Sequence, residues 1–426
     1  WDNWMMNALK LISCTSLKCG LLSYRTVATL RQSSRSYAGF RKLEKLNKQI
    51  HVPGLWKSVI LRSSSSSPKI FSLNKYDKLI GRWLLGCSGM VFGAVVLGGV
   101  TRLTESGLSM VDWHLWKERP PLNNEEWDKE FAKYKLFPEY RYKHKDLTLE
   151  QFKFIWWMEY SHRMWGRLIG GAFFIPAAVF WYKGAFNAAL KKRVIAMGAL
   201  LGFQGLLGWY MVKSGLEERF DDGSSVPRVS QYRLASHLGS AFVLYSLFLW
   251  TSLDSLVPAY KVSEVTPALL KFRKLAHTAK GFVFFTAISG AFVAGLDAGL
   301  VYNSFPKMAD RWFPSDLFAF KPFTHNFTEN PTTVQFDHRI LGTTTLLLVT
   351  AVGLAAIKLK LPPRAKKVAA AMTVAAWTQV LLGITTLLHY VPVPLAAMHQ
   401  SGSLILLSLA LWMTHELKWI KKIPKI

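Results

Sequence analysis

Hydrophobic residues along the chain gather in eight long runs that are separated by polar segments. The runs cover residues 79–100, 153–182, 194–213, 233–256, 274–296, 333–357, 367–390 and 395–417. Each is long enough for a helix to cross about 30 Å of hydrocarbon. Several runs contain glycine or proline, such as Pro176, which transmembrane helices tolerate better than soluble ones. The pattern therefore predicts an all-α integral membrane protein with eight transmembrane helices.

The charges between the runs differ from one side of the predicted membrane to the other. Eight spans place both termini and three loops on one side, and these segments sum to +26, whereas the segments on the opposite side sum to −2. This is the asymmetry of the positive-inside rule. The excess of 53 Lys and Arg over 26 Asp and Glu is therefore a topology signal. Long apolar runs also argue against a soluble nucleic-acid-binding protein, so we expect no nucleic-acid partner.

The residues before the first run have a composition of their own. Residues 1–78 carry 14 Lys and Arg but three acidic residues, and Ser63 to Ser67 form an unbroken serine run. An Arg-rich, Ser-rich, acid-poor segment is typical of a mitochondrial transit peptide. We expect residues 1–75 to be such a transit or disordered basic extension, with the alternative of a basic tail on a bacterial membrane protein. The location then expected is the mitochondrial inner membrane, multi-pass, with both termini in the matrix.

The second half of the chain repeats features of the first half in the same order. Residues 161–166 (SHRMWG) match 337–342 (DHRILG), and residues 204–208 (QGLLG) match 379–383 (QVLLG). His237 and His399 are each followed nine and thirteen residues later by Ser and Trp. These matches predict two tandem four-helix bundles, over residues 76–256 and 257–426. Because four spans is an even number, both bundles have the same orientation, as in parallel repeats.

Four of the eleven histidines lie within the spans, at equivalent places of the repeat: His162, His237, His338 and His399. Ionisable residues inside a membrane are costly and point to function. All four are expected near the outer ends of their spans, as one facing pair in each half. Two imidazoles from facing helices can hold a haem iron from both sides, whereas zinc needs three or four ligands. The alternative is that they are core histidines bonded to neighbouring helices. The other seven lie in the extension, in outer loops or at helix ends.

Arginines and one carboxylate accompany the first histidine of each pair. Arg163, Arg167 and Arg339 are possible partners of haem propionates, because arginine pairs well with buried carboxylates, although each could instead reach the lipid headgroups. Glu159 stands three residues before His162, on the same helix face, while Gln335 stands at the equivalent place before His338. A carboxylate can exchange a proton and an amide cannot. The difference suggests that one site performs chemistry and the other holds a permanent cofactor.

The motif EYSHR at 159–163, HRILG at 338–342, the segment GGVTRLTESGLS at 98–109 and the histidines of the fourth and eighth spans resemble the haem A synthase family. The similarity covers about residues 76–420 and, with the extension, is closest to the mitochondrial type. The resemblance implies oxidation of the C8 methyl of haem O to a formyl group, giving haem A for cytochrome c oxidase. It implies that His338 and His399 are the axial ligands of a haem b cofactor and that His162 and His237 hold the substrate haem O.

The resemblance further implies that Glu159 is the catalytic glutamate. The partners that it implies are membrane lipid, a ferredoxin-type electron donor, and haem O synthase or oxidase-assembly factors. An alternative function is that of a two-haem, cytochrome b-like electron carrier. That function would place its two haems at different depths and would give Glu159 no role. A transporter would instead place polar groups near the membrane midplane on broken helices.

Overall fold

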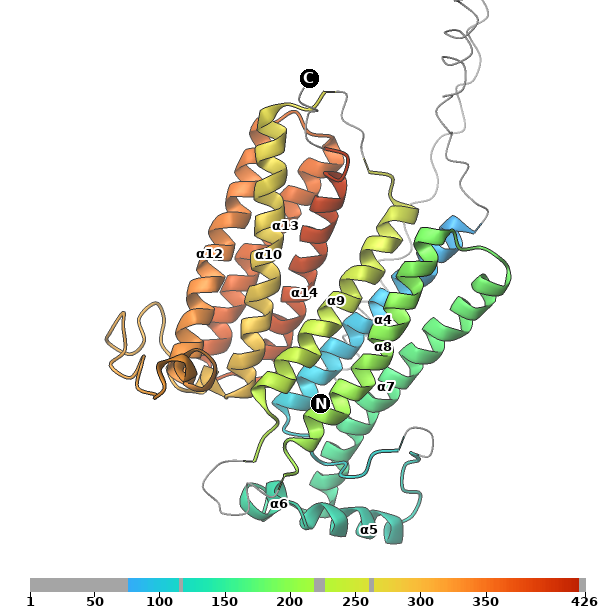
Figure 1. Ribbon diagram of the computed structural model, residues 1–426. Coiled ribbons are helices and arrows are strands. Elements are labelled where there is room, and N and C mark those ends of the chain that lie inside the picture. The colour runs from blue at the N-terminus through green and yellow to red at the C-terminus, as the bar shows by residue number, and fades with distance from the viewer. Residues whose placement is uncertain (1–75, 115–117, 218–226, 260–263, 421–426) are drawn as a thin grey trace, which may run out of the picture. The chain divides into compact units, whose positions relative to one another are not determined.

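A computed structural model describes residues 76–114, 118–217, 227–259 and 264–420 of the chain (Figure 1). The expected extension over residues 1–75 lies outside the described residues. Among the described residues, eight helices are long and apolar enough to cross a membrane. They are α4 (Asp77–Leu103), α7 (Leu149–Tyr182), α8 (Ala188–Lys213), α9 (Gln231–Leu256), α10 (Pro267–Gly295), α12 (Pro331–Lys358), α13 (Pro363–Leu388) and α14 (Val393–Glu416). The prediction of an all-α protein with eight spans is confirmed, and the chain is a multi-pass membrane protein.

The helices begin earlier than the apolar runs, and at α7, α8, α10 and α12 a polar side chain caps the added turn. Thr148 and Gln151 form a capping box at the start of α7, in which each side chain bonds the other residue's backbone N–H. Asn330 caps α12, and Pro331 follows at its first turn. Hydropathy detects the part of a helix that lies in hydrocarbon, whereas these caps extend it into the polar layer.

The contacts between helices follow the same order in both halves of the chain. In the N-terminal half, α4 packs against α7 and α9, and α8 packs against the same two helices. In the C-terminal half, α10 packs against α12 and α14, and α13 packs against these two. Figure 1 shows the two sets as blue-to-green and yellow-to-red helices. Both sets belong to one compact unit, Leu73–Ile426. The equal order of neighbours agrees with a tandem repeat, whose origin by duplication stays a prediction.

The two halves meet along α4, α9, α10 and α14. Polar contacts join them there: the Tyr245 and Ser408 hydroxyls lie 2.6 Å apart, and the Gln400 side-chain amide donates to the Val95 carbonyl at 3.0 Å. At one end of this interface, Asp254 bonds His415 at 3.1 Å and Lys418 at 2.7 Å. Apolar burial gives little drive for helices to associate in lipid, so such polar bonds and close packing hold the halves together.

Two short helices, α5 (Asn124–Lys135) and α6 (Pro138–Tyr142), lie between α4 and α7. They were not expected from the apolar runs. Trp127 and Phe131 of α5 pack on Phe152 and Trp156 in the first turns of α7, forming a second, smaller core. Between α10 and α12 the chain forms η2 (Ala298–Leu300), η3 (Phe323–His325) and α11 (Asn326–Glu329). These connecting segments supply the groups that surround one end of each bundle.

Candidate functional site

The histidines expected to form pairs lie together within each half. The imidazole centroids of His338 on α12 and His399 on α14 are 6.4 Å apart, and their planes are 84° to each other. In the N-terminal half, His162 on α7 faces Gly98 of α4, and His237 on α9 faces Gly208 of α8. All four histidines are half-buried. The expected pairing of facing helices is therefore present in the geometry.

Each histidine ring lies against a glycine of a neighbouring helix. A Cβ atom at Gly98 would come within 2.8 Å of His162 Cε1, and one at Gly383 within 2.8 Å of His399 Cε1. A Cβ atom at Gly208 would lie 3.5 Å from His237 Cε1, and one at Gly290 would lie 3.4 Å from His338 Cε1. These four glycines are called the histidine-facing glycines below. A side chain at Gly98 or Gly383 would crowd its ring, whereas a Cβ at Gly208 or Gly290 would only touch it.

The histidine-facing glycines also place the four rings at one depth. Gly98 lies five residues before Leu103, the last residue of α4, and Gly208 lies five residues before Lys213, the last residue of α8. Gly290 and Gly383 have the same spacing from the ends of α10 and α13. The expectation of four histidines at similar depth toward one side agrees with this spacing. Two haems at different depths, as an electron carrier across the membrane would need, do not agree with it.

The donor set fits a haem iron better than a bare metal ion. Within the part of the chain that the structure describes, no group of three or more His, Cys, Asp or Glu side chains could hold a metal ion. Metal–imidazole bonds are about 2 Å long, so two ligands on opposite sides of an iron have ring centres roughly 6 Å apart. The 6.4 Å between His338 and His399 matches that separation. The separation of the C-terminal pair is therefore compatible with two ligands of one haem iron.

Glu159 is buried on α7 and binds both the segment that follows α4 and its own helix. Its Oε2 accepts hydrogen bonds from the backbone N–H of Met110 at 2.8 Å and the hydroxyl of Ser109 at 2.9 Å. Its Oε1 accepts from Arg163 Nε at 3.1 Å and Nη2 at 2.5 Å. Both carboxylate oxygens thus have two donors each, which is what a carboxylate can accept and an amide cannot.

Arg163 uses all of its donors on protein groups. Besides Glu159, its guanidinium donates to the carbonyls of Asp112 and Met110 at 2.8 Å and 2.7 Å and to Glu118 at 3.1 Å. Arg167 pairs with Glu118 and donates to the carbonyl of His114. Guanidinium has five N–H donors, and those of Arg163 are all engaged. The role of Arg163 and Arg167 toward propionates stays a prediction, and Arg163 has no free donor for it.

The equivalent residues of the C-terminal half have the opposite hydrogen-bond polarity. Arg339 Nη2 donates to Gln335 Oε1 at 2.9 Å, as Arg163 does to Glu159. The Gln335 amide nitrogen, however, donates to the backbone carbonyls of Ala298 at 2.7 Å and Tyr302 at 3.2 Å. Carbonyls face this position where N–H and O–H groups face Glu159. The choice of amide or carboxylate in each half therefore matches the connecting segment that packs on it.

A second buried polar cluster lies outside the spans, around Tyr134 of α5. Its hydroxyl donates to Glu139 at 2.9 Å and lies 2.8 Å from His144 Nδ1. Burial raises the pKa of Glu139 to about 7. The hydrogen bond from His144, together with the ion pair to Lys143, outweighs burial and lowers the pKa of Glu105 to about 2. This cluster was not predicted from the sequence, because its members are spread over about 40 residues between α4 and α7 without a repeating pattern.

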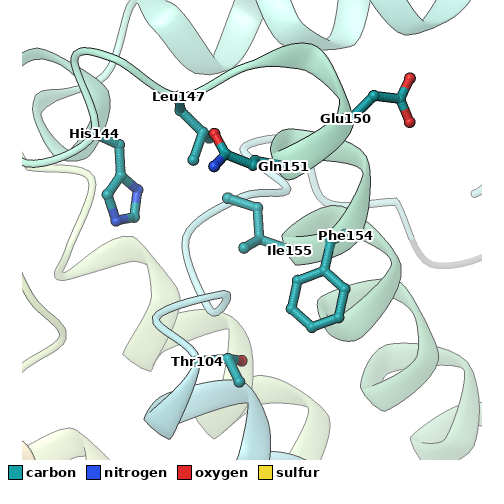
Figure 2. Close-up of a pocket in the computed structure, with 7 residues that line it drawn as sticks. All are labelled: Thr104, His144, Leu147, Glu150, Gln151, Phe154 and Ile155. Atoms are coloured by element: carbon teal, nitrogen blue, oxygen red, sulfur yellow. The ribbon is translucent and has the colours of Figure 1, made fainter. Parts of the chain in front are cut away.

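A pocket of about 450 Å³ opens beside this cluster (Figure 2). Its lining residues come from the end of α4, the connecting segment and the first turns of α7: Thr104, His144, Leu147, Glu150, Gln151, Phe154 and Ile155. None of the four paired histidines lines it. The pocket is therefore distinct from the histidine sites.

The fold and the site together define an eight-helix membrane protein in which each of two helical bundles carries a histidine pair. Residues 81–411 match the COX15-CtaA family model, described as cytochrome oxidase assembly protein, and the chain belongs to this family.

Relatives of known function span animals, fungi and bacteria. A heme A synthase COX15 from Bos taurus is 61% identical over 347 residues, which are 81% of this chain and 84% of the relative. The heme A synthase COX15 of Saccharomyces cerevisiae is 40% identical over 443 residues, 96% of this chain and 90% of the relative. A bacterial heme A synthase, from Nitrosospira multiformis, is 44% identical over 345 residues, 80% and 94% of the two chains. The resemblance drawn from the sequence motifs is confirmed.

Proposed function

We infer that this chain is a haem A synthase, a membrane oxidoreductase that converts haem O to haem A for cytochrome c oxidase. The observation that carries this conclusion is its similarity to heme A synthases over at least 80% of its length. Histidine pairs in both halves give that similarity a chemical basis, because each pair can hold one haem. In the reaction proposed here, the C8 methyl of haem O becomes a formyl group.

We propose that His338 and His399 are the axial ligands of a resident haem b and that His162 and His237 hold the substrate haem O. The 6.4 Å separation of the C-terminal pair supports the first assignment. The second is supported by Glu159, which stands on the same face of α7 as His162 and has only an amide, Gln335, as its counterpart. The N-terminal half is thus the one with a proton-exchanging group beside its histidines.

Bound haem b would supply a one-electron redox centre to the protein. The residues of the chain would bind and orient this haem: the histidines would hold it, and the histidine-facing glycines leave room for their rings. If dioxygen is the oxidant and the donor supplies two electrons for each hydroxylation, two hydroxylations of the methyl group take up protons and form water, and the resulting gem-diol loses water to give the formyl group. We assign the exchange of these protons to Glu159. Its hydrogen bonds to Met110 and Arg163 give this carboxylate a second task, which is to hold the segment after α4 against α7.

The location follows from the charge asymmetry and from the eukaryotic relatives. We propose that the protein resides in the mitochondrial inner membrane with both termini in the matrix, since the basic segments flank that side. A ferredoxin-type donor would then supply electrons, and haem O synthase or oxidase-assembly factors would deliver substrate or receive product.

The test is the pigment that the protein binds and forms. Purified protein is supplied with haem O and a reducing system, and extracted haems are identified by mass and optical spectrum. We expect haem A from the wild type and from His389→Ala, whose exposed histidine ends α13. His162→Ala and His237→Ala should form none and should keep haem b. Two fixed haems of unchanged mass in the wild type would instead make the protein an electron carrier.

A further inference from the structure

His162 on α7 and His338 on α12 occupy equivalent places in the two halves but have different hydrogen-bond surroundings. His338 Nδ1 lies 2.7 Å from Ser289 Oγ on α10. The Ser289 hydroxyl can donate its single hydrogen to the Thr286 carbonyl, 2.8 Å away. When His338 binds a metal through Nε2, its Nδ1 carries the ring hydrogen, and the Ser289 oxygen then accepts it. His162 Nδ1 is equally buried but has no hydrogen-bond partner.

The difference traces to one position of the first helix in each half. Gly98 of α4 and Gly290 of α10 both face the Cε1 atom of the histidine, which makes the two glycines structurally equivalent. The residue directly before them is Leu97 in one half and Ser289 in the other. A leucine side chain cannot accept a hydrogen bond, so His162 lacks what His338 has.

The second histidines of the two pairs share one contact and differ in another. His237 Nδ1 lies 3.2 Å from the side-chain amide of Gln204, and His399 Nδ1 lies 3.2 Å from that of Gln379. The two glutamines occupy matching places on α8 and α13. His399 Nδ1 also lies 3.1 Å from the backbone carbonyl of Gln379, an acceptor that no contact among the described residues matches at His237. Both histidines of the C-terminal half therefore have an acceptor near Nδ1, and His162 is the one histidine of the four whose Nδ1 is buried without any partner in the described part of the chain.

We propose that Ser289 and Leu97 are positioning residues that set how tightly each half retains its haem. The proposal rests on the function proposed above. An acceptor on the second ring nitrogen fixes the tautomer and orientation of a ligating histidine and makes it more basic, and removing it typically costs roughly 10–100-fold in metal affinity. Ser289 gives this support to His338, on the side of the resident cofactor. Leu97 offers no such acceptor to His162, in the half where substrate must enter and product must leave.

The test compares haem dissociation in matched variants of the full chain. Purified protein is mixed with excess apomyoglobin, and the haem left behind is quantified by mass, which separates haem b from haem O with its longer side chain. Ser289→Ala should release haem b roughly 10–100-fold faster and alter its low-spin spectrum. Ser289→Thr, which keeps the hydroxyl, should restore the wild-type rate. Leu97→Ser should slow the release of the substrate haem by a similar factor and should lower turnover through retained product.

A hydroxyl on the same helix pair provides the control. Thr286 Oγ1 lies 2.7 Å from Thr345 Oγ1 and touches no histidine, so Thr286→Val should leave both release rates unchanged. Wild-type release rates in both Ser289→Ala and Leu97→Ser would overturn the proposal, even in an enzyme that forms haem A. Should Ser289→Ala fail to accumulate, Leu97→Ser decides alone, and an unchanged release of substrate haem overturns it. A wild type that forms no haem A would instead overturn the proposed function.

Discussion

Replacing Glu159 by glutamine separates two tasks that this carboxylate could have. The change copies Gln335 into the N-terminal half and keeps the volume of the side chain. From the sequence alone it should remove a proton acceptor and leave the packing intact. The structure predicts a further effect, because three N–H groups point at the Glu159 oxygens: Met110 N at one oxygen, and Nε and Nη2 of Arg163 at the other.

The size of the effect follows from those contacts. A glutamine has one acceptor oxygen, so either Met110 N or the two Arg163 groups would face its NH2. Each buried donor left unpaired costs about 1–3 kcal/mol, and a lost bond to a charged group about 1.5–3 kcal/mol. Arg163 keeps Glu118, so the loss is partly compensated. We expect Glu159→Gln to destabilise the protein by about 2–5 kcal/mol, besides abolishing haem A formation.

The assay combines thermal unfolding in detergent with analysis of the extracted haems. The reverse change, Gln335→Glu, should also destabilise, because a carboxylate would then face the carbonyls of Ala298 and Tyr302. Glu150→Gln is the matched control, since Glu150 lies exposed on the first turn of the same helix and pairs with Lys153. An unfolding temperature for Glu159→Gln equal to that of the wild type would refute the reasoning from hydrogen-bond polarity. Proton exchange would then be the only role left for Glu159.

Three other predictions concern the cofactor, pH and topology. His338→Ala or His399→Ala should purify without haem b, measured by the pyridine haemochrome spectrum, and undiminished haem b would refute the assignment. Glu139 has a folded pKa of about 7, above its ordinary value of 4.5. The contribution of Glu139 to the free energy of unfolding should be complete below pH 4.5 and should be lost as the pH rises through 7, by up to about 3 kcal/mol. In Glu139→Gln, unfolding curves should show a smaller loss of stability over this pH range. Protease added to mitochondria with a permeabilised outer membrane should cut the 101–152 segment. If this segment is cut only when protease has access to the matrix, the proposed orientation of the protein is wrong.

The sequence predicted well whatever depends on periodicity or on repetition along the chain. The eight spans follow from hydropathy, and the pairing of His162 with His237 and of His338 with His399 follows from their matching places in the repeat. The histidine-facing glycines could have been found in the same way, since Gly208 and Gly383 end two matched segments.

What depends on irregular backbone could not be predicted. The contacts of Arg163 and the donors around Glu159 come from residues 109–112 and from Glu118, where neither period nor repeat constrains the chain. The Ser289 contact was missed for another reason. It joins two helices through one hydroxyl, and a serine in an apolar span looks the same in sequence whether it bonds its own helix or its neighbour.

Gly98 and Gly99 are consecutive residues of α4 that serve different halves of the molecule. Gly98 leaves room for the ring of His162, while Gly99 leaves room for the side chain of Gln400, which directly follows His399 on α14. Helix α4 thus lies between the two halves and has a glycine without a side chain facing each of them. A shift of α4 along its axis would therefore change the packing on His162 and on the residue after His399 at once, which couples the surroundings of the two sites through one helix.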